Sequence, residues 1–187
     1  MGLAQILTAF GLSASAGLNA YIPLLIIALL SRFTTWVKLS PPFDVLSNEW
    51  VIGALVVLLV IETFADKIPG VDHVNDFIQT FIRPTAGAVL FASEANVLRD
   101  INPVIPLLAG LLIAGSVHAT KATARPIINL STLGIGAPVV SVVEDVMAVV
   151  TSLVAVFLPF GLILLAMVFL FVLFKLAGRI SRRRSAA

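Results

Sequence analysis

Long apolar runs occupy most of this sequence, and only short polar stretches separate them. The chain is 59% hydrophobic and 12% charged, with a mean hydropathy of +1.09, whereas a soluble domain carries about twice that share of charge. A run of about 20 apolar residues crosses a bilayer as a helix that satisfies its own backbone groups. The runs therefore predict an all-α polytopic transmembrane bundle of about six spans. We expect one domain over residues 1–178 and a basic cytoplasmic tail over residues 179–187.

The first apolar run, residues 3–31, is longer than one simple span needs. Its middle reads GLSASAGLNAYIP, which combines small residues, polar residues and a proline. A broken or re-entrant helix would expose backbone groups, which are tolerated at membrane depth only against protein or water. A long tilted helix that packs through its small residues is the alternative. The sequence leaves both interpretations open.

Prolines set the expected limits of the later spans. Pro84 suits the first position of the third helix, and the amphipathic residues 77–82 before it are expected to lie in the membrane interface. The fourth helix is expected to end near His118, and Pro138 to open the fifth. The spans expected after the first are 50–67, 84–98, 104–118, 138–158 and 161–177.

A weak internal repeat is a further feature of the chain. A shift of 54 residues aligns Lys67 with Lys121 and Pro84 with Pro138. Few identities support the alignment, so chance is the alternative. Paired short or Gly/Pro-interrupted spans are nevertheless the usual pointer to a binding site near the middle of a transporter.

The basic residues divide unequally between the two ends of a six-span bundle. Cytoplasmic loops carry an excess of Lys and Arg, so both termini are expected in the cytoplasm. Nine basic residues fall on the side of the tail, namely Lys67, Arg83, Lys121, Arg125, Lys175, Arg179, Arg182, Arg183 and Arg184, against Arg32, Lys38 and Arg99 opposite.

The stretch from His118 to Asp145 carries most of the polarity in the second half of the chain. If the fifth helix begins at Pro138, then Glu144 and Asp145 lie about 10 Å below the membrane surface. An ionised carboxylate at a helix centre costs roughly 2.5–3.5 kcal/mol, so we expect these acids to bind an ion or a proton. A structural ion pair with a nearby Arg or Lys is the alternative. Four neutral ligands are expected beside the acids: Asn19, Tyr21, Asn129 and Thr132.

Further charged residues gather at the ends of the expected spans on the tail side. They predict a cytoplasmic mouth to a polar path, and an ordinary solvated membrane margin is the alternative. A divalent-metal site is a less favoured alternative, because the acids and histidines near residue 72 do not have the regular spacing of a metal-binding motif. The sequence does not identify a metal. The expected mouth residues are Glu62, Asp66, Lys67, Asp72, His73, Arg83, His118, Lys121 and Arg125.

Three segments resemble a bacterial integral-membrane family that is catalogued only as a domain of unknown function: GLSASAGLNAYIPLL, ADKIPGVDHVNDFIQTFIRPTAGA and HATKATARPIINLSTLG. The resemblance implies a multi-span inner-membrane protein and brings no established activity. ETFADK, residues 62–67, is also similar to the Glu-x-Gly-Asp-Lys motif of small cation/proton exchangers, but with one extra residue and no glycine.

These features together favour a protein that moves a small ion or solute, and a cation best fits the acids. A membrane enzyme or flippase that acts on a lipid phosphate is one alternative, because Arg83, Lys121 and Arg125 could bind phosphate oxygens; a non-transporting assembly subunit is another. No P-loop, HExxH, GxSxG or cysteine cluster occurs, so an enzyme is less expected and no cofactor is. The expected partners are membrane lipids, with anionic lipid at the basic tail, and a homo-oligomer is left open; nucleic acid is not expected.

Overall fold

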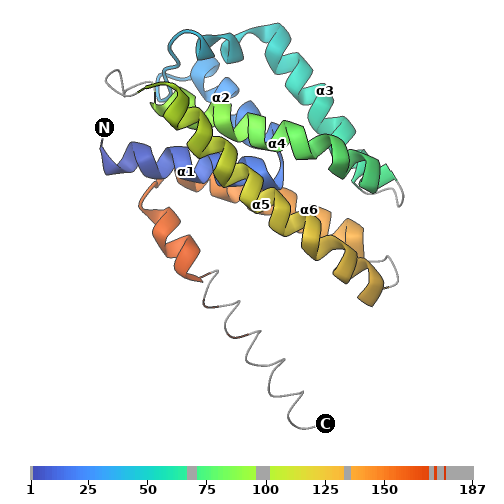
Figure 1. The fold of residues 1–187 in the computed structure, drawn as a ribbon. Helices are drawn as coiled ribbons and strands as arrows, with labels where there is room; N and C mark the ends of the chain where they lie inside the picture. Colours follow the sequence, from blue (N-terminus) through green and yellow to red (C-terminus); the bar gives the residue numbers. More distant parts are fainter. Residues whose placement is uncertain are drawn as a thin grey trace.

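The computed structural model describes residues 2–66, 71–95, 102–132, 136–168, 171 and 175, without the side chains of residues 71–73, 95, 129, 131 and 137. All regular secondary structure in these residues is helical, which confirms the all-α prediction. Residues 161–168 are helical as well. The complete elements are α1 (Leu3–Leu18), α2 (Tyr21–Phe33), the 3-10 helix η1 (Phe43–Ser47), α3 (Glu49–Ala65), α4 (Val71–Ala95), α5 (Val104–Ser131) and α6 (Gly136–Phe157), shown in Figure 1.

Two helices in the described residues are long and apolar enough to cross a membrane. They cover Val104–Ile128 of α5 and Pro138–Phe157 of α6. The predicted limits of the second and fifth spans agree with α3 and α6 to within two residues. The number of six spans stays a prediction, and the basic tail lies outside the described residues.

The first apolar run forms two helices with a break between them, as the broken-helix interpretation predicted. α1 ends at Leu18 and α2 begins at Tyr21. Asn19 satisfies the exposed backbone of the break, because its Oδ1 accepts hydrogen bonds from the N–H groups of Tyr21 (3.0 Å) and Ile22 (3.1 Å). At the other side of the break, the Leu18 carbonyl accepts a hydrogen bond of 3.0 Å from the Lys121 ammonium. Protein groups thus replace the water that a broken helix needs.

α1 and α2 form a hairpin whose outer ends lie at the same end of the bundle. α1 runs antiparallel to α6, since Thr8 donates to the Ala155 carbonyl and Asn19 donates to Asp145. Trp36, just after α2, stacks edge-on against Phe157 at the end of α6 where Thr8 also lies. Figure 1 shows α2 returning beside α1. The prediction of two termini on one side assumed that residues 3–31 cross a membrane once, and that orientation stays a prediction.

α4 and α5 each continue through a proline, so two predicted helix limits are wrong. α4 runs from Val71 through Pro84, which does not open the helix, and α5 continues past His118 and Pro126 to Ser131. A proline removes one backbone hydrogen bond, but close packing between the two helices compensates. Gly87 and Gly110 allow this packing: a Cβ atom added at Gly87 would lie 2.7 Å from the Gly110 carbonyl oxygen.

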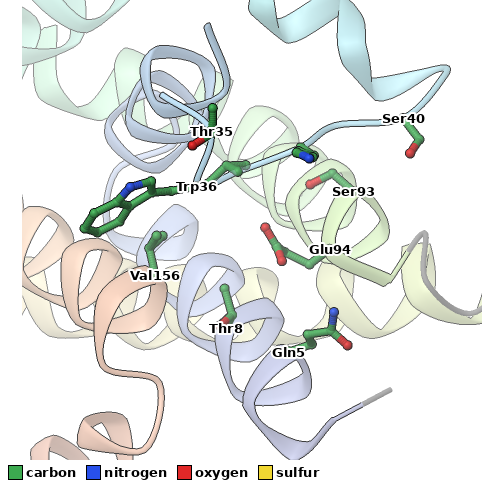
Figure 2. Close-up of a pocket in the computed structure, with 10 residues that line it drawn as sticks. Gln5, Thr8, Thr35, Trp36, Ser40, Ser93, Glu94 and Val156 are labelled. Carbon is green, nitrogen blue, oxygen red and sulfur yellow. The ribbon is translucent and has the colours of Figure 1, made fainter. Parts of the chain in front are cut away.

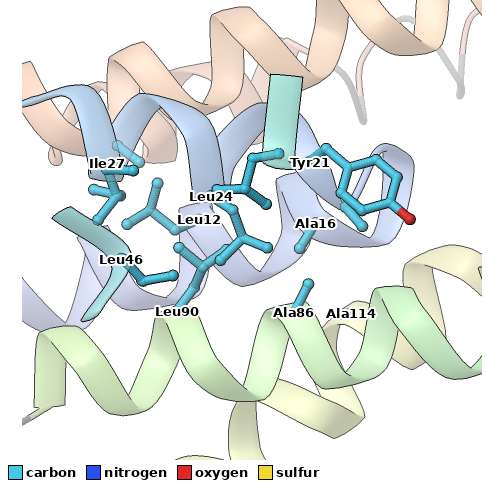
Figure 3. Close-up of a cluster of buried hydrophobic side chains, with 13 residues drawn as sticks. Leu12, Ala16, Tyr21, Leu24, Ile27, Leu46, Ala86, Leu90 and Ala114 are labelled. Carbon is cyan, nitrogen blue, oxygen red and sulfur yellow. The ribbon is translucent and has the colours of Figure 1, made fainter. Parts of the chain in front are cut away.

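The interior and the exterior of the bundle have an unusual polarity. An apolar cluster that includes Leu12, Leu24 and Leu90 lies among the first helices (Figure 3). α3 shows the reverse of ordinary amphipathicity, because the polar Glu62 is 1% exposed whereas the apolar Phe64 is 66% exposed. Apolar side chains thus cover much of the outside, and charged side chains lie inside.

Candidate functional site

A set of charged side chains, here called the ion cluster, fills the interior near the α1–α2 break. Arg83 is fully buried, and the other basic members are no more than 6% exposed. α3, α4, α5 and α6 all contribute to it. The ion cluster consists of Glu62, Asp66, Asp76, Arg83, His118, Lys121, Arg125 and Glu144.

Arg125 joins three acids from three different helices. Its Nη2 atom donates to Asp66 Oδ2 at 2.8 Å and to Glu144 Oε2 at 2.9 Å, and its Nη1 atom lies 3.2 Å from Asp76 Oδ2. Asn75 also donates to Asp66, at 2.7 Å. A planar guanidinium with several fixed donors suits such a multiple contact better than an ammonium does. Arg125 therefore ties α5 to the end of α3, to α4 and to α6.

The Lys121 ammonium is surrounded by oxygen atoms at the helix break. Nζ lies 2.8 Å from Glu144 Oε2, 3.0 Å from the Leu18 carbonyl oxygen and 3.7 Å from Asp66 Oδ2. The last carbonyls of a helix carry partial negative charge, so the end of α1 adds to the attraction of the two carboxylates. Carboxylate and carbonyl oxygens are also the ligands that hard cations take in proteins.

Arg83 and His118 form the other half of the ion cluster. Arg83 Nη2 donates to Glu62 Oε1 at 2.8 Å, and Arg83 Nη1 lies 3.1 Å from His118 Nδ1. Because arginine can only donate, His118 Nδ1 must accept, and the ring proton is on Nε2. Nε2 then donates to the Thr80 hydroxyl at 3.1 Å. His118 is thus a neutral, oriented imidazole between α4 and α5.

Asp145 lies beside the ion cluster, at the tip of the hairpin. Its Oδ1 atom accepts a hydrogen bond of 2.9 Å from Asn19 Nδ2. Asp145 comes nine residues after Gly136, the first residue of α6, which places it about 13 Å along that helix. A single side chain, Asn19, therefore connects the backbone break to a half-buried carboxylate of α6.

Comparison with known protein families places this chain in one of them. The family described as "Domain of unknown function (DUF4126)" matches residues 6–179. The chain belongs to this family. No curated protein and no solved structure matches the chain.

The structure brings together most of the site residues that the sequence of this DUF4126 protein predicts. Glu144 pairs with Lys121 and Arg125, which are the ion pairs of the alternative interpretation, and Asn19 donates to Asp145 beside them. The predicted mouth residues that are described are buried in the bundle instead of forming a solvated rim. These are Glu62, Asp66, Arg83, His118, Lys121 and Arg125.

One predicted ligand, Thr132, lies apart from the ion cluster of the DUF4126 chain. It is exposed and caps helices, because its hydroxyl donates to the Ile128 carbonyl and accepts from the Gly136 N–H. Tyr21 packs in the apolar cluster, but its hydroxyl points away from the leucines in Figure 3 and hydrogen-bonds Gln79, close to Glu62 and Arg83 of the ion cluster. Lys67 and the side chains of Asp72, His73 and Asn129 lie outside the described residues.

Sequence reasoning missed three polar residues on α4 that lie beside the ion cluster. Asn75, Gln79 and Thr80 share a helical stripe with Asp76 and Arg83. A spacing of three and four residues marks one face of a helix, so this stripe was readable once the helix was continued through Pro84. No group of acids and histidines within the described residues could hold a metal ion, and the metal question for Asp72 and His73 lies outside them.

Proposed function

We propose that this DUF4126 protein is an integral protein of the bacterial inner membrane that moves a small cation through its interior. The observation that carries the proposal is the oxygen-lined position of the Lys121 ammonium at a helix break. A carbonyl at the end of α1 and carboxylates from α3 and α6 already surround a positive charge there. The same oxygens could take a cation that has lost its water.

The distribution of polarity supports placement in a membrane. Exposed Val57, Ile61 and Phe64 of α3 would face lipid, while Glu62 on the same helix faces Arg83. Contiguous apolar surfaces of this extent are rare on soluble monomers. Charged residues inside a membrane almost always face a bundle interior and pair with one another, as the members of the ion cluster do.

The α1–α2 hairpin supports a translocation path. α1 and α2 have 16 and 13 residues, which gives lengths of about 24 and 20 Å, short of the ~30 Å hydrocarbon core. Paired half-helices that end near the middle of a membrane line the ion sites of many transporters. In this proposal the hairpin enters from one side, and its tip at Asn19 meets the buried ion cluster, which separates the tip from the other side.

The proposed mechanism is an exchange of positive charge at the hairpin tip. An entering cation displaces the Lys121 ammonium from Glu144, and Asp145 beside Asn19 supplies a further carboxylate. Four buried atoms of the ion-cluster region have no hydrogen-bond partner within the described residues: Glu62 Oε2, Gln79 Oε1, Arg83 Nε and Arg125 Nε. Unsatisfied buried polar atoms cost about 1–3 kcal/mol each, so water or an ion that reaches them is stabilised.

Flux into proteoliposomes tests the proposal. Uptake of Na⁺, K⁺ and H⁺, each driven by its own gradient, is compared with that of protein-free vesicles. We expect one of these cations to enter, and the Glu144→Gln/Asp145→Asn double variant to lower its flux at least tenfold. Glu49→Gln, an exposed acid paired with Arg32, is the control and should leave the flux unchanged. Full flux in the double variant would dismiss the proposed site.

An assembly subunit without transport is the second candidate, and one observation favours it. Glu144 already contacts both Lys121 and Arg125, as expected if the acids have only a structural role. That candidate predicts no flux of any cation above protein-free vesicles and a stable complex with a partner protein. The lipid-phosphate alternative gains no support from the geometry, because Arg83, Lys121 and Arg125 all contact carboxylates.

A further inference from the structure

A pocket lies at the end of the bundle opposite the ion cluster. It has a volume of about 540 Å³ and lies between the start of α1, the segment after α2 and the ends of α4 and α6. Glu94 in this pocket is eleven residues after Arg83 on the same helix, a separation of about 17 Å along the axis. The pocket is therefore a separate site, and it does not depend on the proposed ion path. Figure 2 shows its lining.

Glu94 is the most unusual residue of the pocket wall. Its carboxylate points into the space between Thr8, Ser93 and Trp36 in Figure 2. Within the described residues, neither a hydrogen bond nor an ion pair engages this carboxylate. Glu94 is half-buried, and even partial removal of a carboxylate from water without a partner costs free energy. A positively charged group in the pocket would compensate for that cost.

The other walls indicate what kind of molecule would carry that charge. Trp36 also lines the pocket, and an aromatic ring attracts a cation that lies over its face within about 6 Å. Lys38 also lines the pocket and is exposed, so it can approach an acidic group of the same ligand. Thr35 and Gln5 add a hydroxyl and an amide, which suit phosphate oxygens. The wall thus has an acid for one end of a zwitterion and a base for the other.

We propose that this pocket binds an ethanolamine-phosphate group, with the primary ammonium on Glu94 beside Trp36 and the phosphate on Lys38. Pockets for small molecules have volumes of about 300–1,000 Å³, so the space admits this group with part of an attached glycerol. The group could come from free phosphoethanolamine or from the head group of a phospholipid.

Tryptophan fluorescence provides a direct test, since the chain has two tryptophans and only Trp36 lines the pocket. In a Trp50→Phe background, phosphoethanolamine is titrated into the purified full-length protein in detergent. We expect a saturable change in Trp36 emission, and at least tenfold weaker binding for ethanolamine alone, phosphate alone and phosphocholine. Phosphocholine tests the ammonium because it cannot donate a hydrogen bond to Glu94.

Variants separate the pocket from general charge effects. Glu94→Gln is expected to weaken phosphoethanolamine binding at least tenfold, whereas Asp44→Asn, an exposed acid outside the pocket lining, leaves it unchanged. If Glu94→Gln fails to fold, Lys38→Met decides, with an expected tenfold loss for phosphoethanolamine and none for ethanolamine. A wild type without saturable change, or unchanged binding in Glu94→Gln or in a decisive Lys38→Met, would overturn the proposal.

Binding measurements in lipid nanodiscs distinguish the two sources of the ligand. In discs of phosphatidylethanolamine, a lipid head group that already fills the pocket weakens the apparent binding of free phosphoethanolamine relative to discs of phosphatidylcholine. Equal binding in both discs assigns the pocket to the free molecule. Either result supports the site, because Glu94→Gln must weaken binding in both.

Discussion

Arg125 shows how much one side chain contributes at the scale of single residues. It is 5% exposed and contacts Asp66, Asp76 and Glu144. Removing one partner of a buried ion pair leaves uncompensated charge, which costs about 3–5 kcal/mol. Here the loss would leave three neighbouring carboxylates that repel one another, with Lys121 as the remaining partner of Asp66 and Glu144. Arg125 is therefore a main source of compensating charge for these acids in the interior.

We predict that Arg125→Ala destabilises the protein by about 3–5 kcal/mol, measured as the loss of helical signal on denaturation in detergent. Arg125→Lys should recover part of the loss, because an ammonium restores the charge but cannot make every contact. Arg32→Ala is the matched control: Arg32 pairs with Glu49 at the surface, and exposed pairs contribute about 1 kcal/mol or less. Equal losses in Arg125→Ala and Arg32→Ala would contradict this account of the ion cluster.

Asn19 has two separate roles at the residue scale, and substitutions distinguish them. Its Oδ1 caps α2, and its Nδ2 donates to Asp145. Asn19→Ala loses both, and we expect a larger decrease in unfolding temperature than for Asn48→Ala, which removes a cap from the exposed start of α3. Loss of an ordinary cap costs about 1 kcal/mol. Asn19→Asp keeps the cap but faces Asp145 with a second acid, so its stability should fall with rising pH. If Asn19→Ala lowers the unfolding temperature no more than Asn48→Ala does, Asn19 acts only as a helix cap.

At the scale of elements, close packing of α4 against α5 explains why both helices continue through a proline. Gly87 and Gly110 face each other, and Ser13 of α1 donates to the Gly87 carbonyl at 2.9 Å. The small residues let the helix backbones approach closely. Thr85 also donates to the Phe81 carbonyl at 2.7 Å, one turn back and next to Pro84. Tertiary contacts thus outweigh the local tendency of proline to end a helix.

We predict that Gly87→Ala lowers the unfolding temperature, because the added Cβ would lie 2.7 Å from the Gly110 carbonyl oxygen and the helices would have to separate. Gly53→Ala is the matched control: nothing lies within 4 Å of its added Cβ in α3, so the better helix propensity of alanine should raise stability by up to about 1 kcal/mol. The opposite signs are measured by thermal unfolding in one detergent. A Gly87→Ala protein as stable as the wild type would show that the helices are not held at this distance.

The sequence predicted some elements well and others poorly, for identifiable reasons. α3 and α6 are bounded by polar residues and by glycine or proline, so their limits were readable. The start at Pro84 and the end near His118 were predicted wrongly, because a local rule does not include the packing of α4 against α5 that lets both helices continue through a proline. The break at Asn19 remained open for the same reason: Lys121 and Asp145, which bond to Leu18 and Asn19, come from over 100 residues away. The Glu144–Asp145 pair was readable because charge in an apolar run is conspicuous.

At the scale of the whole molecule, the hairpin determines which ends of the chain share a side. The hydrogen bond of Thr8 to Ala155 and the stacking of Trp36 on Phe157 place the start of α1 and the segment after α2 at one end. Thr132, which follows α5, lies at the other end with the start of α6. If the bundle crosses a membrane, a re-entrant hairpin leaves residues 2 and 35 together, whereas a single crossing separates them.

Cysteine labelling tests this topology cleanly, because the chain has no native cysteine. Single variants Gly2→Cys, Thr35→Cys and Thr132→Cys, at exposed positions, are treated in intact cells and in inside-out vesicles with a maleimide that cannot cross membranes. We predict that positions 2 and 35 react from the same side and position 132 from the opposite side. Because Lys and Arg gather at the end that holds the ion cluster, position 132 should react in the inside-out vesicles. Reaction of position 2 together with position 132 would instead require the first run to cross the membrane once.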